Sequence, residues 1–243
     1  MKETTELQTV LTKKGSAFKK YKALVIGQGG IFSLFKYEII TLLFGGLPGA
    51  LGIFARKIFY RVLFKKIGRG VILGKGLTLR HPGKISLGNN VIIDDYCVLD
   101  AKGEKDDGIY IGDNTFISRN TILSCKGGKI EIGENTNIGA YCSIYSESSV
   151  KLGKNILIAG FTYIVAGGSH DFSRKDIPIM AQPSLSLGGV VIHDNVWLGA
   201  RVTVLDGVTI GRDTLVGAAG LVNKDLPEFV VAAGIPARVI KQR

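Results

Sequence analysis

The chain has 243 residues, of which 46% are hydrophobic and 21% charged, and this composition excludes an intrinsically disordered protein. Its 33 glycines follow no Gly-X-Y period, so a collagen-like chain is excluded as well. The net charge of +11 comes almost wholly from residues 1–70, which hold 13 Lys and Arg against 3 Asp and Glu. Because the remainder is nearly neutral and has no recognisable nucleic-acid-binding module, this charge favours an anionic membrane surface near the N-terminus over nucleic acid.

Residues 1–66 are expected to form a basic and apolar helical segment. Within residues 31–66 the longest run without charge covers residues 39–55, which is the lower limit for a membrane-spanning helix and is weakened by Pro48. We therefore expect two short helices, broken near residues 45–49, that lie on an anionic membrane surface. Flanking cations would face the lipid head groups: Lys36, Arg56, Lys57, Arg61, Lys65 and Lys66. The alternative is a helical cap that buries the apolar side chains against the body or another subunit.

From residue 67 onward, aliphatic residues recur at every sixth position, in sets of three. The sets are Ile67/Leu73/Leu79, Leu87/Ile93/Leu99, Ile111/Ile117/Leu123, Ile132/Ile138/Ile144, Leu152/Ile158/Ile164, Ile192/Leu198/Val204 and Ile210/Val216/Val222. A period of six suits a short strand followed by a corner, and three such units close a triangular coil. Residues 67–243 are therefore predicted to form an all-β domain, a parallel β-helix of about seven triangular coils. The glycines that follow many of these residues are expected to adopt turn conformations.

Additional residues enter this pattern only between the third unit of one coil and the first unit of the next. These insertions cover residues 81–83, 103–108, 126–129, 146–148 and 166–189, so all should emerge along one edge of the prism. The longest contains His170, and a loop of this length usually has a function. A histidine there can act as a general base, whereas the alternative is an exposed or hydrogen-bonded structural histidine.

Four features resemble the left-handed β-helix (hexapeptide-repeat) acyltransferases, more narrowly the branch with galactoside, maltose, xenobiotic and capsule-sugar O-acetyltransferases. They are the six-residue repeat, GSHDF (168–172), VWLGARVTVLDGVTIG (196–211) and the ending GAAGLVNKDLPEFVVAAGIPARVIKQR (217–243). The resemblance covers residues 67–243 and is most specific over 152–243. It implies left-handed winding, acetyl-CoA as acyl donor, and a homotrimer with its sites between subunits.

The resemblance also implies roles for individual residues. His170 matches the catalytic histidine, which would deprotonate the acceptor hydroxyl as that attacks the thioester. Trp197 matches the aromatic residue beside the pantetheine arm, and Ala200 and Ala218 match positions whose backbone groups bond its amides. Four residues match the region that meets the nucleotide and its phosphates: Asn223, Lys224, Arg238 and Lys241. No metal ion is expected.

The acceptor is open, because the region that would bind it holds Tyr141, Cys142 and Ser143, which do not match the galactoside enzymes. The group that orients His170 is also open, with Asp171 and Glu147 as candidates. We expect O-acetylation of a sugar in a surface polysaccharide or its lipid-linked precursor, by a cytoplasmic enzyme on the inner face of the membrane. The alternatives are N-acetylation of an aminosugar or nucleotide sugar, and a non-catalytic trimeric scaffold.

The histidines and the cysteines do not indicate a zinc site or a disulfide framework. A zinc enzyme resembling the γ-type carbonic anhydrases would need histidines at one ion, but His81 and His193 are five coils apart, roughly 24 Å at the usual strand spacing. The cysteines number three and have no CxxC spacing, so Cys97, Cys125 and Cys142 are expected to be reduced, buried thiols.

Overall fold

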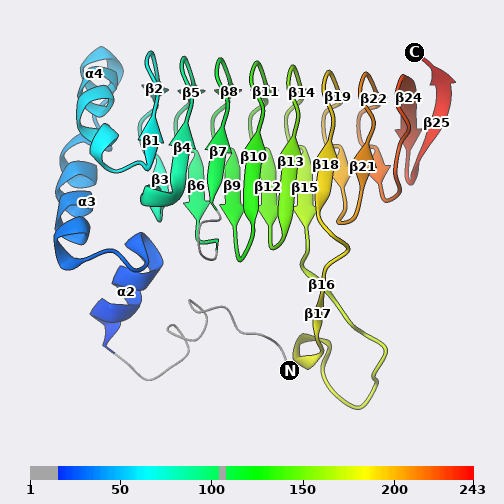
Figure 1. Cartoon of the computed structure of the whole chain (residues 1–243), viewed down its shortest axis with the longest axis horizontal. Coiled ribbons are helices and arrows are strands. Elements are labelled where there is room, and N and C mark those ends of the chain that lie inside the picture. The colour runs from blue at the N-terminus through cyan, green and yellow to red at the C-terminus, as the bar shows by residue number, and fades with distance from the viewer. Residues whose placement is uncertain (1–15, 104–107) are drawn as a thin grey trace.

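A computed structural model describes residues 16–103 and 108–243, and it shows a three-sided β-solenoid preceded by helices (Figure 1). Sheet A contains β1 (Lys66–Ile67), β4 (Ile85–Leu87), β7 (Ile109–Ile111), β10 (Lys129–Ile132), β13 (Ser149–Leu152), β18 (Val190–Ile192) and β21 (Thr209–Ile210). Sheet B contains β2 (Ile72–Leu73), β5 (Ile92–Ile93), β8 (Phe116–Ile117), β11 (Asn137–Ile138), β14 (Leu157–Ile158), β19 (Trp197–Leu198), β22 (Leu215–Val216), β24 (Val230–Gly234) and β25 (Ala237–Gln242). Sheet C contains β3 (Thr78–Arg80), β6 (Val98–Ala101), β9 (Ile122–Cys125), β12 (Ser143–Ser146), β15 (Tyr163–Ala166), β20 (Thr203–Val204) and β23 (Leu221–Val222).

The predicted repeat is confirmed position by position. Each aliphatic residue of the pattern pairs in parallel register with its equivalent in the next coil, as in Ile132 with Leu152 on sheet A and Ile138 with Ile158 on sheet B. All 21 point inward and are buried, apart from the partly buried Ile67 in the first coil. The three cysteines are also buried, and burial raises the pKa of the Cys97 thiol to about 11, so it stays protonated.

The glycines that follow these residues have a different role from the expected one. None of the repeat glycines has a positive φ, so turn conformation does not explain them. Instead, a Cβ at Gly139 would come within 2.6 Å of the backbone nitrogen of Gly160 in the next coil. Asn and aromatic residues occupy many of the left-handed corner positions, among them Asn114, Asn135 and Tyr141.

We name the three edges of the prism by the sheets that meet there: A–B, B–C and C–A. The insertions that the structure describes all lie on the C–A edge, where the strands of sheet C lead into those of sheet A, as predicted. A short helix, η2 (Pro82–Lys84), occupies the first of them. Residues 104–107 of another insertion lie outside the described residues.

Three helices close the N-terminal end of the prism: α2 (Ala17–Ile26), α3 (Ile31–Phe44) and α4 (Gly49–Phe59), followed by η1 (Tyr60–Val62). The break between α3 and α4 lies where it was expected, and α2 lies within the segment expected to be helical, although no separate helix was predicted at that position. Val25, Leu34 and Tyr37 join the core of the first coil, and the hydroxyl of Tyr37 donates to the carbonyl of Leu79. The helices are therefore a cap, and their outer face stays uncovered.

Arg56 is a correction to the expected ring of lipid-facing cations. Its side chain is 1% exposed, and its guanidinium donates to the backbone carbonyls of Leu73, Phe44 and Leu47. Burial lowers the pKa of Arg56. It therefore fastens α4 to the first coil and to the turn before α4, and it takes no part in a membrane surface.

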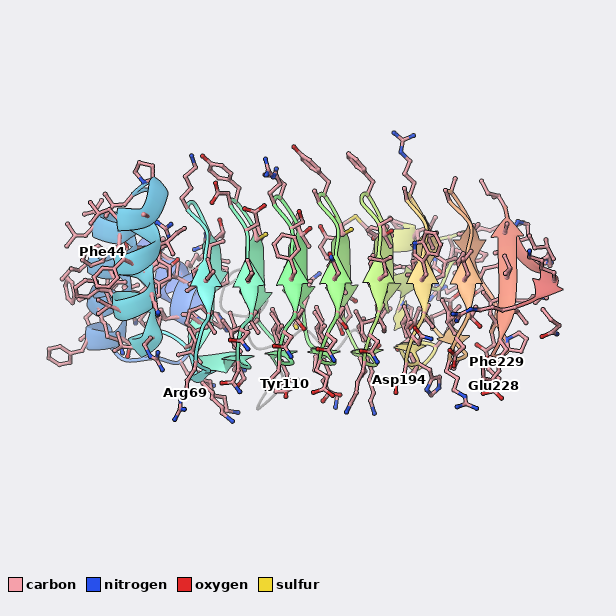
Figure 2. All side chains as sticks on the ribbon, turned by 90° about the horizontal axis from the view of Figure 1, so that it is seen from above. Phe44, Arg69, Tyr110, Asp194, Glu228 and Phe229 are labelled. Atoms are coloured by element: carbon pink, nitrogen blue, oxygen red, sulfur yellow. The ribbon has the colours of Figure 1, made fainter. Side chains whose placement is uncertain are left out.

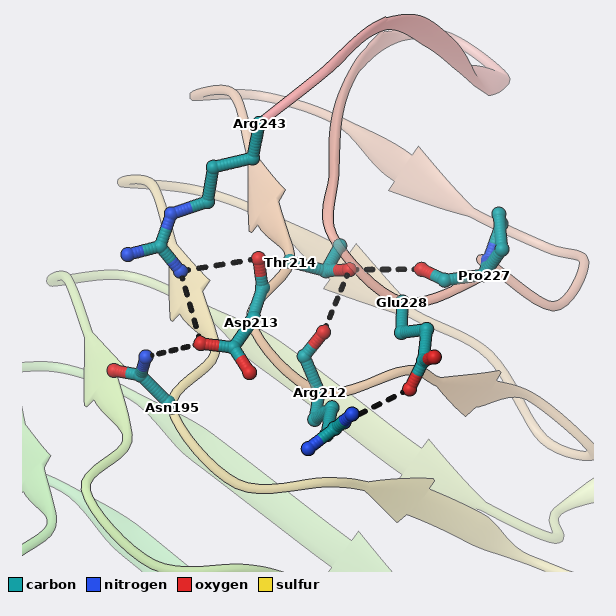
Figure 3. Close-up of polar contacts among 7 residues, drawn as sticks. All are labelled: Asn195, Arg212, Asp213, Thr214, Pro227, Glu228 and Arg243. Atoms are coloured by element: carbon teal, nitrogen blue, oxygen red, sulfur yellow. Dashed lines mark hydrogen bonds and ion pairs between the residues drawn. The ribbon is translucent and has the colours of Figure 1, made fainter.

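The C-terminal end is closed by β24 and β25, which pair antiparallel in an otherwise parallel sheet. Figure 3 shows how the last residue is fastened to the A–B edge: Arg243 donates to the backbone carbonyl and the carboxylate of Asp213, which also accepts from Asn195. At the same edge, Arg212 pairs with Glu228, which precedes β24, at 2.9 Å. The two contacts hold the terminal hairpin of β24 and β25 against the last coil.

Candidate functional site

The long insertion leaves sheet C as an ordered hairpin that carries His170. Gly167 and Gly168 have φ values of 87° and 81°, which turn the chain away from β15. Next, β16 (Ser169–His170) pairs antiparallel with β17 (Ser184–Leu185), with His170 opposite Ser184. The imidazole thus stands on a paired strand at the C–A edge of the fifth coil (Figure 1).

Two polar side chains that sequence reasoning missed hold this insertion in place. The carboxylate of Asp206 accepts from the backbone nitrogens of Leu187 and Gly189 at 2.6 and 2.9 Å, which fixes the returning strand to the sixth coil. Gln182, fully buried beside η3 (Ile179–Ala181), accepts from the backbone nitrogen of Arg174 and donates to its carbonyl. Asp206 lies within the stretch 196–211 that carries the resemblance, but nothing in the sequence pattern indicates its contacts, and Gln182 belongs to no motif.

The Nδ1 atom of His170 is buried and has no hydrogen-bond partner among the described residues. Neither candidate for orienting the ring contacts it. Asp171 accepts from the backbone nitrogen of Ser173, which lowers the pKa of its carboxyl group, and Glu147 lies 3.5 Å from Lys126. No described side chain is therefore assigned as the group that orients the ring.

The residues assigned to coenzyme A lie mostly on sheet B and the B–C edge. Trp197 is 47% exposed on the outer face of β19, and it belongs to a column of outward residues. The end of that column runs Trp197, Leu215, Val231 and Lys241 across four neighbouring strands. Arg238 lies on the same hairpin opposite Ala233. An aromatic side chain and two cations are thus joined by a track roughly 14 Å long, from three strand spacings.

Ala200 and Ala218 occupy equivalent corners of neighbouring coils, beside this track. Both are exposed, and neither backbone N–H donates to another group among the described residues. The next residue of this corner has a left-handed conformation in every coil, and it changes along the prism. It is Tyr141 and then Phe161, which stack at 5.1 Å, then Arg201, whose guanidinium lies 5.8 Å from the Phe161 ring centroid, and finally Ala219. The edge therefore becomes small only at Ala218 and Ala219.

Asn223 and Lys224 lie elsewhere. They follow β23 and so occupy the C–A edge of the seventh coil, the same edge that carries His170. In a triangle, the C–A edge is opposite sheet B, and Figure 1 shows the hairpin of β16 and β17 leaving on the side away from β19 and β22. One chain therefore presents two half-sites on opposite sides: His170, Asn223 and Lys224 on one, and Trp197, Ala200, Ala218, Arg238 and Lys241 on the other.

The chain contains no group of three or more His, Cys, Asp or Glu side chains arranged to hold a metal ion within the described ranges. His81 and His193 differ in burial and in hydrogen bonding, and they lie far apart along the prism. His81 is buried and its Nε2 donates to the carbonyl of Ala23 at 2.8 Å, whereas His193 is exposed after β18.

Comparison with known proteins agrees with this geometry. Residues 189–220 match the family model "Bacterial transferase hexapeptide (six repeats)", and residues 129–166 match "Hexapeptide repeat of succinyl-transferase". Galactoside O-acetyltransferase of Escherichia coli K12 is 36% identical over 134 residues, which are 54% of this chain and 63% of that protein. The putative lipopolysaccharide biosynthesis O-acetyl transferase WbbJ of the same strain is 35% identical over 57% of this chain and 74% of WbbJ.

Two further relatives cover more of the chain. The dTDP-4-amino-4,6-dideoxy-D-glucose acyltransferase of Escherichia coli is 30% identical over 74% of this chain and 83% of that protein. A solved structure of a variant of AntD, an N-acyltransferase from Bacillus cereus, in complex with dTDP and coenzyme A, superposes with a TM-score of 0.50. It is 27% identical and covers 77% of this chain and 89% of AntD. The chain belongs to the hexapeptide-repeat acyltransferase family.

Proposed function

We propose that the protein transfers an acetyl group from acetyl-CoA to a hydroxyl of a sugar, in a surface polysaccharide or its lipid-linked precursor. The observation that carries this proposal is the position of the His170 ring, which is held on a paired strand at the edge that carries the long insertion. The sugar class comes from galactoside O-acetyltransferase and WbbJ, and the donor comes from the coenzyme A bound to AntD.

In this mechanism His170 acts as general base. It takes the proton of the acceptor hydroxyl while the oxygen attacks the thioester carbonyl of acetyl-CoA. A carbon–oxygen bond forms, the carbon–sulfur bond breaks, and the proton passes from the imidazole to the departing thiolate. The balance needs no covalent enzyme intermediate and no metal ion, so treatment with EDTA should leave turnover unchanged.

The donor would lie along the track on sheet B. Trp197 offers an apolar surface to the pantetheine arm, and the free N–H groups of Ala200 and Ala218 can donate to its amide carbonyls. Arg238 and Lys241 stand at the far end, where charge-assisted bonds to phosphates are favourable.

The site is complete only when a second copy brings its sheet B against the C–A edge of the first. Repeating this contact gives a ring, so we propose a homotrimer with cyclic symmetry. Two surfaces support it. The outward residues of sheet B are mostly apolar: Ile72, Ile92, Phe116, Asn137, Leu157, Trp197, Leu215 and Val231. The insertion exposes large apolar side chains as well, with Phe172, Met180 and Leu187 each at least 70% exposed.

Replacing the base tests the mechanism. His170→Ala should lower transfer by ~10²–10⁴-fold while the trimer and coenzyme A binding are retained. His193→Ala is the matched control, because it removes an exposed histidine from the A–B edge of the next coil. Near-normal turnover in His170→Ala would remove this residue from the mechanism.

Mixing two inactive variants tests whether the site is shared. Ala218→Trp should block the track on sheet B, and His170→Ala removes the base from the opposite half-site. Trimers reassembled from both variants contain some contacts with two intact halves, so activity should reappear. Continued inactivity of the mixture, with trimers present by light scattering, would reject the shared site.

A second candidate is N-acylation of a nucleotide-linked aminosugar. The sequence match to the relative named for dTDP-4-amino-4,6-dideoxy-D-glucose covers 74% of the chain, against 54% and 57% for galactoside O-acetyltransferase and WbbJ. The AntD complex contains dTDP as well as coenzyme A. The same base could serve an amine. Transfer rates to a matched sugar and aminosugar, each free, nucleotide-linked and lipid-linked, decide between the two reactions.

We also propose that the enzyme works in the cytoplasm on the inner face of the membrane, held there by residues 31–66. None of the described helices is long and apolar enough to cross a bilayer alone. Only α2 and α3 taken together reach that length and composition, and the two helices are bent by 72° at the break between them. The uncovered outer face of α3 and α4 supports contact with the lipid surface instead.

Pelleting with anionic vesicles tests this contact. A triple variant with Phe35, Leu42 and Phe54 each replaced by Ser should remain in the supernatant. Ile235→Ser with Ile240→Ser is the control, because these exposed residues lie at the other end.

A further inference from the structure

The α3 and α4 helices are apolar on two faces. The inner face of α3 carries Leu34 and Tyr37, which are buried against the first coil. Its outer face carries Phe32 and Leu42, which are 85% and 82% exposed, and Leu51 of α4 is 72% exposed. A helix of a water-facing cap normally carries polar residues on its outer side. A helix that is apolar all round needs a second apolar phase or partner on that side.

This outer face is the end of the prism. Figure 1 places α3 and α4 beyond β1 and β2, on the side away from every later coil, and Figure 2 shows side chains projecting from that end around Phe44. The rings of Phe44 and Phe59 stack at 4.1 Å and join the two helices. The apolar surface therefore faces along the prism axis.

The charge around this surface is mostly positive. Residues 16–66 contain eight Lys and Arg besides the buried Arg56, and a single acidic residue, Glu38, which accepts a hydrogen bond from Tyr21. Lys57, Arg61 and Lys65 are exposed near the helical end. Apolar side chains surrounded by cations match an anionic lipid surface, in which acyl chains lie behind negative head groups.

We propose that the protein docks end-on, with the outer face of α3 and α4 in an anionic bilayer and the prism axis along the membrane normal. In a trimer whose symmetry axis runs along the prisms, the three helical ends face the same way and enter one plane. The docked molecule then stands upright, with β25 farthest from the lipid.

Upright docking sets the height of the catalytic base. His170 leaves the fifth coil, four coil steps above the first, which corresponds to about 19 Å at the strand spacing. The layer of helices adds about 10 Å, so the ring is roughly 30 Å above the bilayer surface. The insertion leaves the prism sideways and does not turn back toward α3 or α4 (Figure 1).

This height selects the acceptor, a step that rests on the proposed function. The first sugar of a lipid carrier lies at the head-group level and cannot reach a base at that height. The acceptor is therefore a sugar several units along a membrane-anchored glycan, which extends upward beside the prism.

Energy transfer to the lipid measures the orientation. Single cysteines at Ser86, Lys151 and Thr209 place a fluorophore on the outer face of sheet A in the second, fifth and seventh coils, and the native cysteines are buried. With an acceptor dye in anionic vesicles, transfer should fall steadily from Ser86→Cys to Thr209→Cys, over about 24 Å. Equal transfer from all three positions would mean side-on docking and would overturn the proposal.

Lipid-anchored glycans of one unit and of many units test the acceptor. On vesicles, the wild type should acetylate the long glycan and leave the single sugar unmodified, while detergent should remove this preference. Equal rates on vesicles would overturn the selection by height. If no acceptor is acetylated under any condition, the proposed function fails and the selection of acceptor fails with it, but energy transfer still decides the orientation.

Discussion

The prism and its helical cap place their apolar side chains differently. In the prism, inward and outward positions alternate along each strand, so one face of each residue pair is buried and the other meets solvent, as in Ile138 and Asn137. In the cap, apolar residues point both inward and outward, as Leu34 and Phe35 do. The comparison separates surfaces that fold the chain from surfaces that remain available for binding.

The two regions also differ in how they satisfy buried polar groups. Inside the prism, neutral hydroxyls donate to carbonyls of the next coil, as Thr121 does to Gly139 at 2.9 Å. The cap depends on one buried cation, Arg56, which serves three carbonyls at once. The cap is therefore the region where one substitution has the widest effect.

The largest effect is expected at that cation. Arg56→Leu leaves three buried carbonyls without a donor, which should lower the free energy of unfolding of the cap by about 3–5 kcal/mol. Hydrogen exchange in α3 and α4 measures it. Lys57→Leu is the matched control, because Lys57 is the exposed neighbour. Similar exchange in both variants would show that Arg56 does not fasten the cap.

A core residue of the prism should come next. Ile138→Ala removes a fully buried side chain between Ile117 and Ile158, which should cost about 2–5 kcal/mol in urea unfolding. Asn137→Ala, one residue away on the outer face, should change stability by less than about 0.5 kcal/mol. A cost at Asn137 equal to that at Ile138 would contradict the assigned inward and outward faces.

The junction between the regions should depend on pH through His81. Burial lowers the pKa of this imidazole, although its bond to Ala23 acts in the opposite direction. The unfolded chain therefore takes up a proton first, so the junction loses stability as pH falls below about 6.5, until the lower folded-state pKa is passed. Because intrinsic amide exchange slows as the pH falls, the measure is the protection factor of α2, which should decrease between pH 7.5 and 5. His81→Asn tolerates the left-handed backbone, with φ of 49°, and should abolish the pH dependence. Retained dependence would assign it to another group.

The smallest effect on folding should come from the outer face of the cap. Phe54 is 62% exposed, so Phe54→Ser should change the thermal unfolding of the protein in solution by less than about 0.5 kcal/mol. The paired measurement is vesicle binding, which should weaken. A large loss of stability in solution would mean that this face is already buried against protein.

Sequence periodicity predicted the prism almost completely, because every coil has the same backbone path and therefore needs inward Ile, Leu or Val residues at the same six-residue spacing. It predicted the edge that carries His170 for the same reason. It missed α2 because Lys19, Lys20 and Lys22 hide its single buried side chain, Val25. It misplaced Arg56 because a cation among apolar residues has the same sequence pattern whether it meets lipid or three carbonyls. The contacts of Asp206 reach back about one coil in sequence, and those of Gln182 stay within the insertion, where no repeat constrains the chain.

A stack of parallel strands has no built-in length, because the last coil offers its backbone groups to any further strand, including one from another molecule. The reversed direction of β25 and the tether from Arg243 to Asp213 terminate this growth at one end, and the helices do so at the other. The solenoid therefore stays a discrete particle instead of lengthening into a fibre.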